Sequence, residues 1–119
     1  MNLKPFTLYL TYEADDLNRI CKKLLEYDDT ADGETFYRYM RSGLLNRKVF
    51  PFIAYDTEGK MMCTFVINIT QAITQKERKL FIQGVWIDAH YPKFWRKGMK
   101  ILEEACRTFG IKKMVAYTR

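Results

Sequence analysis

The clearest pattern of apolar and polar positions lies in the last third of the chain. Residues 80–88 are rich in aromatic and β-branched side chains, a composition typical of a buried strand. Farther on, apolar residues recur at spacings of three and four and share one face of a helix that ends at Gly110; they are Ile101, Leu102, Ala105 and Phe109. The pattern predicts a strand, a turn over residues 89–98 and an amphipathic helix.

The N-terminal part of the chain predicts one strand and two helices. Residues 5–12 (PFTLYLTY) form the expected strand. The next apolar positions have the spacing of a helix that begins near Asp15 and Asp16, whose charges suit a helix N-terminus; they are Leu17, Ile20, Cys21, Leu24 and Leu25. After an acidic loop at residues 28–33, a second and less regular helix is expected over residues 34–45.

A β-hairpin is expected in the middle of the chain. Residues 49–55 predict a strand, and Pro51 assigns its start to an edge or irregular position. Gly59 lies in the turn at residues 56–60, and residues 61–70 form the return strand, whose alternate residues make an apolar face. The return strand should lie at the centre of the sheet, and the expected core residues are Phe65, Ile67 and Ile87 with Leu24, Leu102 and Phe109.

These elements, with a short final strand at residues 112–118, give the order β-α-α-β-β-β-α-β. Because a helical crossover leads to the last strand, the last two strands should be parallel. The chain has 119 residues, of which 48% are hydrophobic, so residues 1–119 are expected to form a single domain. The predicted fold class is α/β (α+β), with a mixed, mainly antiparallel sheet.

Four cations lie in or just after the turn at residues 89–98, namely Lys93, Arg96, Lys97 and Lys100. A helix start directs backbone N–H groups and the positive end of its dipole outward, so this place suits a phosphate or another anion. The alternative is an ordinary solvated basic face.

The composition bears on the partners, the location and the cysteine chemistry of the protein. The net charge of +6 favours anionic partners, and nucleic acid is one of them, although the sequence contains no nucleic-acid-binding motif. The chain has no apolar run long enough for a membrane span and no N-terminal signal pattern, which predicts a cytoplasmic protein. The three cysteines are odd in number and far apart, and we expect buried thiols and no metal site; they are Cys21, Cys63 and Cys106.

Three stretches together resemble the GNAT superfamily of acyl-CoA-dependent N-acetyltransferases. They are Val85 to Tyr91 (VWIDAHY), Ile101 to Ala105 (ILEEA) and Gly110 to Lys113 (GIKK), and they look like strand 4, helix 3 and the start of strand 5 of that family. The resemblance implies a GNAT-like fold that binds acetyl-CoA and transfers its acetyl group to an amine. The pantetheine arm would lie along the strand at Val85 and Ile87, between strands 4 and 5.

In the family, the turn after strand 4 carries R/Q-x-x-G-x-G/A, whose backbone N–H groups hold the pyrophosphate. Counting back from the helix places Lys93, Arg96 and Gly98 at the three signature positions. Counting forward from Tyr91 places Pro92, Trp95 and Lys97 there instead. The resemblance thus implies a degenerate pyrophosphate loop in which Lys93, Arg96, Lys97 and Gly98 contact the cofactor.

The family also continues beyond strand 5 with another helix and two strands, so the chain is expected to be a shortened version at its C-terminus. Asp88 could act as the general base for the amine, or as a turn or capping carboxylate. Tyr117 is the candidate proton donor to the leaving thiolate.

Two classes of function remain open at this stage. One is an acetyltransferase. The other is a non-catalytic GNAT-like interaction module, a component of a larger cellular or viral (phage) assembly. An open sheet edge would also suit a homodimer or such an assembly.

Overall fold

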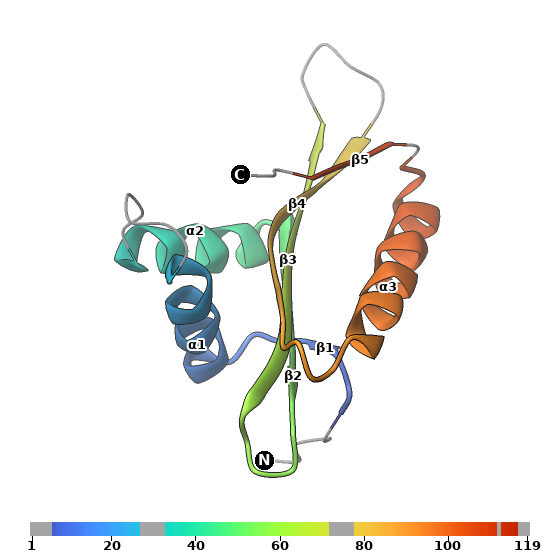
Figure 1. Ribbon diagram of the computed structural model, residues 1–119. Coiled ribbons are helices and arrows are strands. Elements are labelled where there is room, and N and C mark those ends of the chain that lie inside the picture. Colours follow the sequence, from blue (N-terminus) through green and yellow to red (C-terminus); the bar gives the residue numbers. More distant parts are fainter. Residues whose placement is uncertain (1–5, 27–32, 72–77, 112, 117–119) are drawn as a thin grey trace.

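A five-stranded sheet forms the centre of the protein (Figure 1), in a computed structural model that describes residues 6–26, 33–71, 78–111 and 113–116. The elements are β1 (Tyr9–Leu10), α1 (Ala14–Leu25), α2 (Gly33–Leu45), β2 (Val49–Tyr55), β3 (Met61–Gln71), β4 (Arg78–Ile87), α3 (Lys93–Phe109) and β5 (Lys113–Ala116). The strands follow one another across the sheet in chain order. The first three pairings are antiparallel, and β4 and β5 are parallel. The predicted element order and fold class are confirmed.

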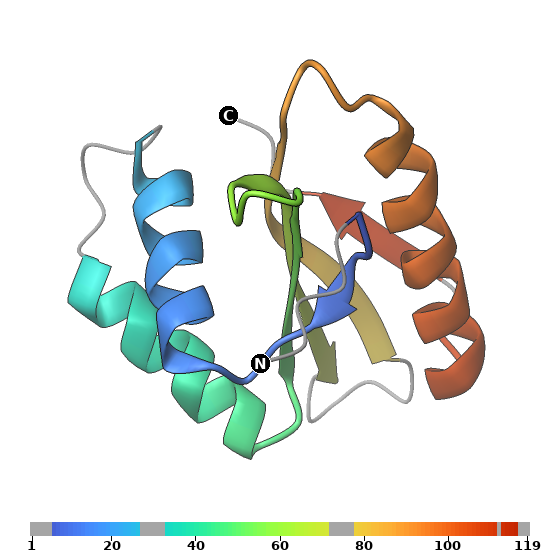
Figure 2. The same ribbon diagram turned by 90° about the horizontal axis from the view of Figure 1, so that it is seen from below.

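The helices lie in two layers on opposite faces of the sheet. Helices α1 and α2 cover one face and α3 covers the other (Figure 2). Glycine allows a close contact between helix and sheet in each layer. A Cβ on Gly43 of α2 would lie 2.2 Å from a methyl carbon of Val49, and one on Gly98 of α3 would lie 2.2 Å from the ring of Phe65. None of the described helices combines the length and the apolar character needed to cross a membrane.

The central hairpin forms as the sequence predicts. Strand β2 has the expected bounds, and Gly59 occupies the turn with a φ of 79°, a conformation that favours glycine. The Asp56 carboxylate accepts hydrogen bonds from the main-chain N–H groups of Glu58 and Lys60, both at 2.8 Å. These bonds fix the turn and therefore the register of β2 against β3.

Strand β1 is much shorter than predicted. Only Tyr9–Leu10 pair with β2, because Phe6 turns with a φ of 61° and Thr11 begins the passage into α1. The Thr11 N–H still donates to the Pro51 carbonyl at 3.0 Å. The polar main-chain groups of Pro51 therefore face the side where β1 ends. The N–H that proline lacks would have pointed to that side too, so the proline removes no hydrogen bond to β3.

Strand β3 is buried on both faces, where the sequence predicted one apolar face. All seven side chains from Met61 to Ile67 are buried, including the polar Thr64. Thr64 satisfies its hydroxyl by donating to the Phe52 carbonyl at 2.8 Å. The double burial follows from the helical layers on both sides, and it confirms β3 as the central strand.

The predicted core is correct for Phe65, Ile67 and Leu102, which are at most 3% exposed. Leu24 and Ile87 are half-buried at its margin. Phe109 was predicted to be buried but is 37% exposed, because it lies at the end of α3, where only one side of its ring packs on Phe50. Of the cysteines, Cys21 and Cys63 are buried as expected, whereas Cys106 is half-buried.

Helix α3 begins earlier than the sequence predicts. Its first residue is Lys93, so the connection from β4 is confined to residues 88–92, and the proposed turn at 89–98 is wrong. Pro92 precedes the helix with a φ of −63°, which is suited to a helix start. Gly110 ends the helix with a φ of 65°, as predicted. Gly98 consequently lies within the helix.

A buried carboxylate joins α1 to the sheet. Asp16 is 4% exposed and accepts hydrogen bonds from the hydroxyls of Thr11, at 2.6 Å, and Tyr55, at 2.5 Å. The Arg19 guanidinium lies over the Tyr55 ring, 5.3 Å from its centroid. Two donors and a nearby cation compensate the burial of the Asp16 side chain.

Replacing Tyr55 by phenylalanine should lower the free energy of unfolding by about 1–2 kcal/mol, because a buried carboxylate loses a donor. Burial and then the hydrogen bond to Asp16 raise the pKa of Tyr55 above its ordinary value of 10.0, so folding favours the neutral phenol. This contribution is present below pH 10.0 and is lost as the pH rises through the folded-state pKa. Denaturant unfolding of wild type and Tyr55→Phe should therefore give a smaller difference at about pH 11 than at about pH 8. The exposed Tyr12→Phe is the control, and an equal loss in both variants would contradict the assignment.

Candidate active site

Among the described residues, one half of strand β4 pairs on both sides and the other half, residues 83–87, pairs with β3 alone; we call residues 83–87 the open half of β4. Strand β3 pairs along β4 as far as Ile87, whereas the pairing with β5 covers Lys79 to Ile82. A register shift separates the two halves, because Ile67 pairs with Ile82 while Val66 pairs with Gly84. The extra residue, Gln83, is a bulge at the point where the paired half ends.

The main chain of Val85 and Ile87 faces the open side of β4. The Asp88 N–H donates to the Met62 carbonyl on β3 at 2.9 Å. Because backbone groups alternate in direction along a strand, the N–H and C=O groups of Trp86 also face β3, and those of Val85 and Ile87 face away from it. Two sets of donors and acceptors thus point to the side on which β5 lies. These are the two strand residues that the resemblance to the GNAT family assigns to the cofactor.

The side chains of this segment divide between the two helical layers. Val85 and Ile87 pack on the α3 side with Phe94 and Tyr91. Trp86 lies on the α1 side, and a Cβ on Gly84 would lie 2.6 Å from a methyl carbon of Leu24 in α1. The open half of β4 is therefore covered by α3 on one face and approached by α1 on the other.

Asp88 organises the turn between β4 and α3. Its carboxylate accepts from the main-chain N–H of His90 and lies 2.8 Å from His90 Nδ1. The hydrogen bond from the His90 main chain, and then that from its ring, lower the pKa of Asp88 below its ordinary value. A carboxylate with a lowered pKa is a weaker base, so this geometry favours the turn role over the general-base role.

The turn uses many of its own amide groups. Besides the His90 N–H, the N–H of Tyr91 donates to Asp88, that of Phe94 to Tyr91 and that of Trp95 to Pro92. Any phosphate at the start of α3 would therefore depend more on side-chain cations and on the helix dipole than on backbone amides.

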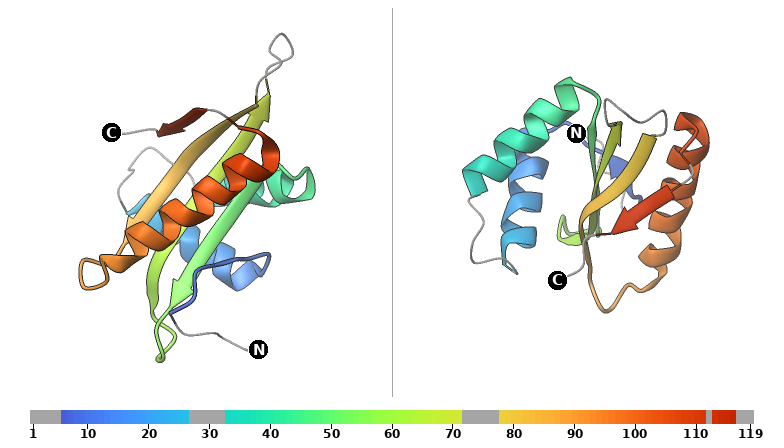
Figure 3. Two further views of the ribbon diagram at one scale, coloured as in Figure 1. Left: turned by 90° about the vertical axis from the view of Figure 1, so that its right-hand side faces the viewer. Right: turned by 90° about the horizontal axis from the view of Figure 1, so that it is seen from above.

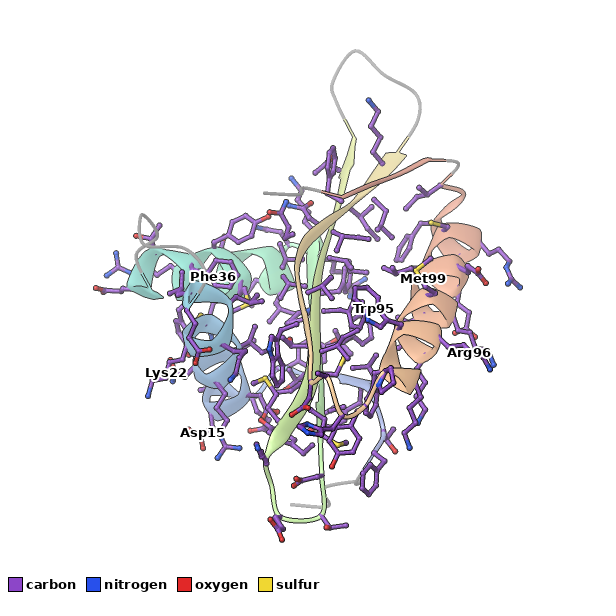
Figure 4. All side chains as sticks on the ribbon, in the orientation of Figure 1. Asp15, Lys22, Phe36, Trp95, Arg96 and Met99 are labelled. Atoms are coloured by element: carbon purple, nitrogen blue, oxygen red, sulfur yellow. The ribbon has the colours of Figure 1, made fainter. Side chains whose placement is uncertain are left out.

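The four cations of α3 do not converge on one point. Lys97 Nζ donates to the Phe6 carbonyl at 2.9 Å, and Lys93 Nζ lies 5.2 Å from the centroid of the Phe6 ring. Arg96 points away from the sheet (Figure 4), and Lys100 is also exposed. Their spacing of i, i+3, i+4 and i+7 places the four cations in one stripe along α3, in which Lys93 and Lys97 turn to Phe6 and Arg96 to solvent.

The flank of α3 that faces β4 and β5 carries Trp95 and Met99. With Gly98 facing the sheet, Lys97 lies about 100° to one side, whereas Trp95 and Met99 lie about 60° and 100° to the other. Figure 3 shows β5 on one side of α3 and the N-terminal segment, which Lys97 contacts, on the other. Trp95 is 55% exposed and packs edge-on against Phe65 at 6.3 Å, and Met99 is 39% exposed.

Of the residues predicted for the site, Val85, Ile87 and Asp88 are neighbours at the end of β4, and Lys93 to Gly98 lie in the first turns of α3. Gly98 faces the Phe65 ring and is therefore not directed to a cofactor. Tyr117 lies outside the described residues. Met99 was missed, and Trp95 was weighed only as a residue of the turn. Their four-residue spacing would have indicated a shared face if the helix had been extended to Lys93.

Solved structures of acetyltransferases have the same arrangement of elements. An aminoglycoside 6'-N-acetyltransferase from Acinetobacter baumannii superposes with a TM-score of 0.73 at 13% identity, covering 95% of this chain and 79% of the other. A predicted acetyltransferase from Clostridium acetobutylicum, solved with acetyl-CoA, gives 0.73 at 17% identity, covering 94% and 81%. A GNAT family acetyltransferase from Staphylococcus aureus gives 0.67 at 13%, covering 95% and 86%. The chain has the GNAT fold.

At these identities the GNAT likeness concerns the fold alone. No family model matches the sequence, and a search of curated proteins found no match either. In the described part of the chain, no group of three or more acidic, histidine or cysteine side chains could hold a metal ion. The residues that bear on the chemistry of this GNAT-fold protein are those of the open half of β4 and of the first turns of α3.

Proposed function

We propose that this protein transfers the acetyl group of acetyl-CoA to an amine. The observation that carries the proposal is the open half of β4, where Val85 and Ile87 direct main-chain groups to the side on which β5 lies. The pantetheine arm of acetyl-CoA contains amide groups in an extended chain, and such a chain can pair with a free strand edge as an added strand does.

The residues around this edge fit the other parts of the cofactor. Trp95 and Met99 would cover the arm from α3, since both are exposed and apolar on the flank toward β4. The phosphates would lie at the start of α3, where Lys93, Arg96 and Lys97 supply charge. Gly98 would contribute by bringing α3 close to β3. Bound acetyl-CoA would supply an acetyl thioester, which an amine can attack.

The acceptor amine would approach from the α1 side of β4. The α3 side is covered at Val85 and Ile87 by Phe94 and Tyr91, whereas Gly84 and Trp86 face α1. Asp88 would hold the turn in place, and Tyr117 remains our candidate for protonating the leaving thiolate.

Calorimetric titration with acetyl-CoA tests the proposal. We expect saturable binding of one cofactor per chain, with a mild dependence on salt. Replacing Arg96 by alanine should weaken binding by about tenfold, because a charge-assisted contact contributes roughly 1.5–3 kcal/mol. The control is Arg38→Ala, which removes an exposed cation on α2, across the sheet. Absence of binding at millimolar cofactor and low salt would reject the enzyme and leave the interaction module.

A further inference from the structure

Lys23 lies on the side of α1 that faces β4. Its Nζ is 4.5 Å from the centroid of the Trp86 ring, and only 28% of its side chain is exposed. The next residue, Leu24, packs directly on the main chain at Gly84. The preceding residue, Lys22, is exposed and points away from the sheet (Figure 4). Two adjacent lysines thus differ in their relation to the open half of β4.

Lys23 and Leu24 contact the two residues that flank Val85 in the sequence. Gly84 and Trp86 are its two neighbours, and the Val85 main chain faces the open edge. A thioester held along this edge would therefore lie beside the layer in which the Lys23 amine is placed. Lys93 and Lys97 belong to the opposite layer, where they contact Phe6.

A proton acceptor also lies close to this amine. Glu26 Oε2 is 3.6 Å from Lys23 Nζ, one helical turn along from it. The Glu26 side chain is 55% exposed, so a proton that it accepts can pass to solvent. The structure therefore places a primary amine, an aromatic ring that holds it and a carboxylate together on the acceptor side of β4.

We propose that Lys23 is a self-acetylation site, the amine to which this protein transfers an acetyl group from its own acyl thioester cofactor. The inference rests on the proposed function. Glu26 accepts a proton from the Lys23 ammonium, and the freed nitrogen lone pair attacks the thioester carbonyl carbon. The C–N bond forms and the C–S bond breaks. The thiolate leaves with the electron pair of that bond and takes a proton from solvent, and the nitrogen releases its remaining extra proton to give the neutral amide.

Acetylation would change the contacts of Lys23 as well as its charge. The neutral amide loses the cation–π contact with Trp86 and the ion pair with Glu26. The modified side chain would therefore be held less firmly over the Trp86 ring.

The test is incubation of the whole chain with acetyl-CoA, followed by mass spectrometry of its peptides. We expect Lys23 to be acetylated at least about tenfold faster than Lys22, because positioning beside the thioester raises the effective concentration of the amine. Acetic anhydride, a donor that needs no binding site, should reverse the order, since Lys22 is the more exposed. Glu26→Gln should slow labelling of Lys23 by acetyl-CoA relative to its labelling by the anhydride.

Lys23→Arg separates this inference from the proposed function. Arginine keeps the positive charge over Trp86 but cannot be acetylated in this way, so the variant should bind acetyl-CoA as wild type does and lack the main modification. If acetyl-CoA binds to wild type but labels Lys22 and Lys23 equally, the self-acetylation site is wrong and the proposed function survives. If acetyl-CoA neither binds nor labels, both are wrong.

Discussion

Replacing Val85 by proline should weaken the binding of acetyl-CoA by about tenfold or more while the protein stays folded. Proline removes the N–H that faces the open side of β4 but removes no hydrogen bond to β3, because the N–H groups that face β3 belong to alternate residues such as Trp86 and Asp88. A lost hydrogen bond and the bulk of the ring at the edge together should exceed about 1.4 kcal/mol, which is a factor of ten in affinity. Calorimetry with acetyl-CoA measures the effect, and circular dichroism checks the fold.

The contrasting variant is Trp86→Pro. Its proline removes an N–H that pairs with β3 at the centre of the sheet, and it also removes the Trp86 ring from the α1 layer. We expect this variant to lose several degrees of melting temperature more than Val85→Pro. Equal loss of stability in the two variants would show that the direction of the backbone groups is assigned wrongly. Unchanged affinity in a folded Val85→Pro would count against an added-strand contact.

Replacing Gly98 by alanine should lower the free energy of unfolding by about 2 kcal/mol. The new Cβ would lie 2.2 Å from the Phe65 ring, and Phe65 is only 3% exposed, so the ring has little room to move. Overpacking of this kind costs up to about 3 kcal/mol, from which the better helix propensity of alanine subtracts about 1 kcal/mol. Denaturant unfolding measures the difference.

A second substitution tests whether the Phe65 ring is the cause. In a Phe65→Leu background the ring is absent, so Gly98→Ala should become neutral or stabilising there. The two effects should therefore be non-additive, as expected for side chains in contact. If alanine costs the same in both backgrounds, the close approach of α3 to β3 at Gly98 is not the source of the loss.

Most of the secondary structure follows from periodicity. The helix over residues 14–25 shows the three- and four-residue spacing of its buried face, and the hairpin at 49–71 shows its turn residues. The parallel pairing of β4 with β5 follows from the crossover through α3 alone. The start of α3 was missed because basic residues around a glycine were interpreted as a loop, although Lys and Arg are good helix formers and Pro92 suits a helix start.

The candidate site was only partly accessible to sequence reasoning. The strand at Val85 and Ile87 could be predicted from its composition, whereas their assignment to a cofactor came from the resemblance to the GNAT family and stays a prediction. The directions of the cations could not be predicted, because they depend on where the helix starts. A helix that begins at Lys93 places Lys97 beside Phe6, whereas Arg96 faces solvent. The pairing of Lys23 with Trp86 joins positions distant in the sequence, and no local pattern indicates it.

The pairing of β2, β3 and β4 with their neighbours in the sequence has a consequence for the order of folding. Adjacent strands joined by short connections close small loops, which is fast, whereas β5 reaches β4 only after the whole of α3. We therefore expect a three-stranded meander to form the folding nucleus, with α3 docking afterwards through Gly98 and Phe65. The edge that we propose for the cofactor, which needs β4, α3 and β5 together, would then be among the last parts of the protein to assemble.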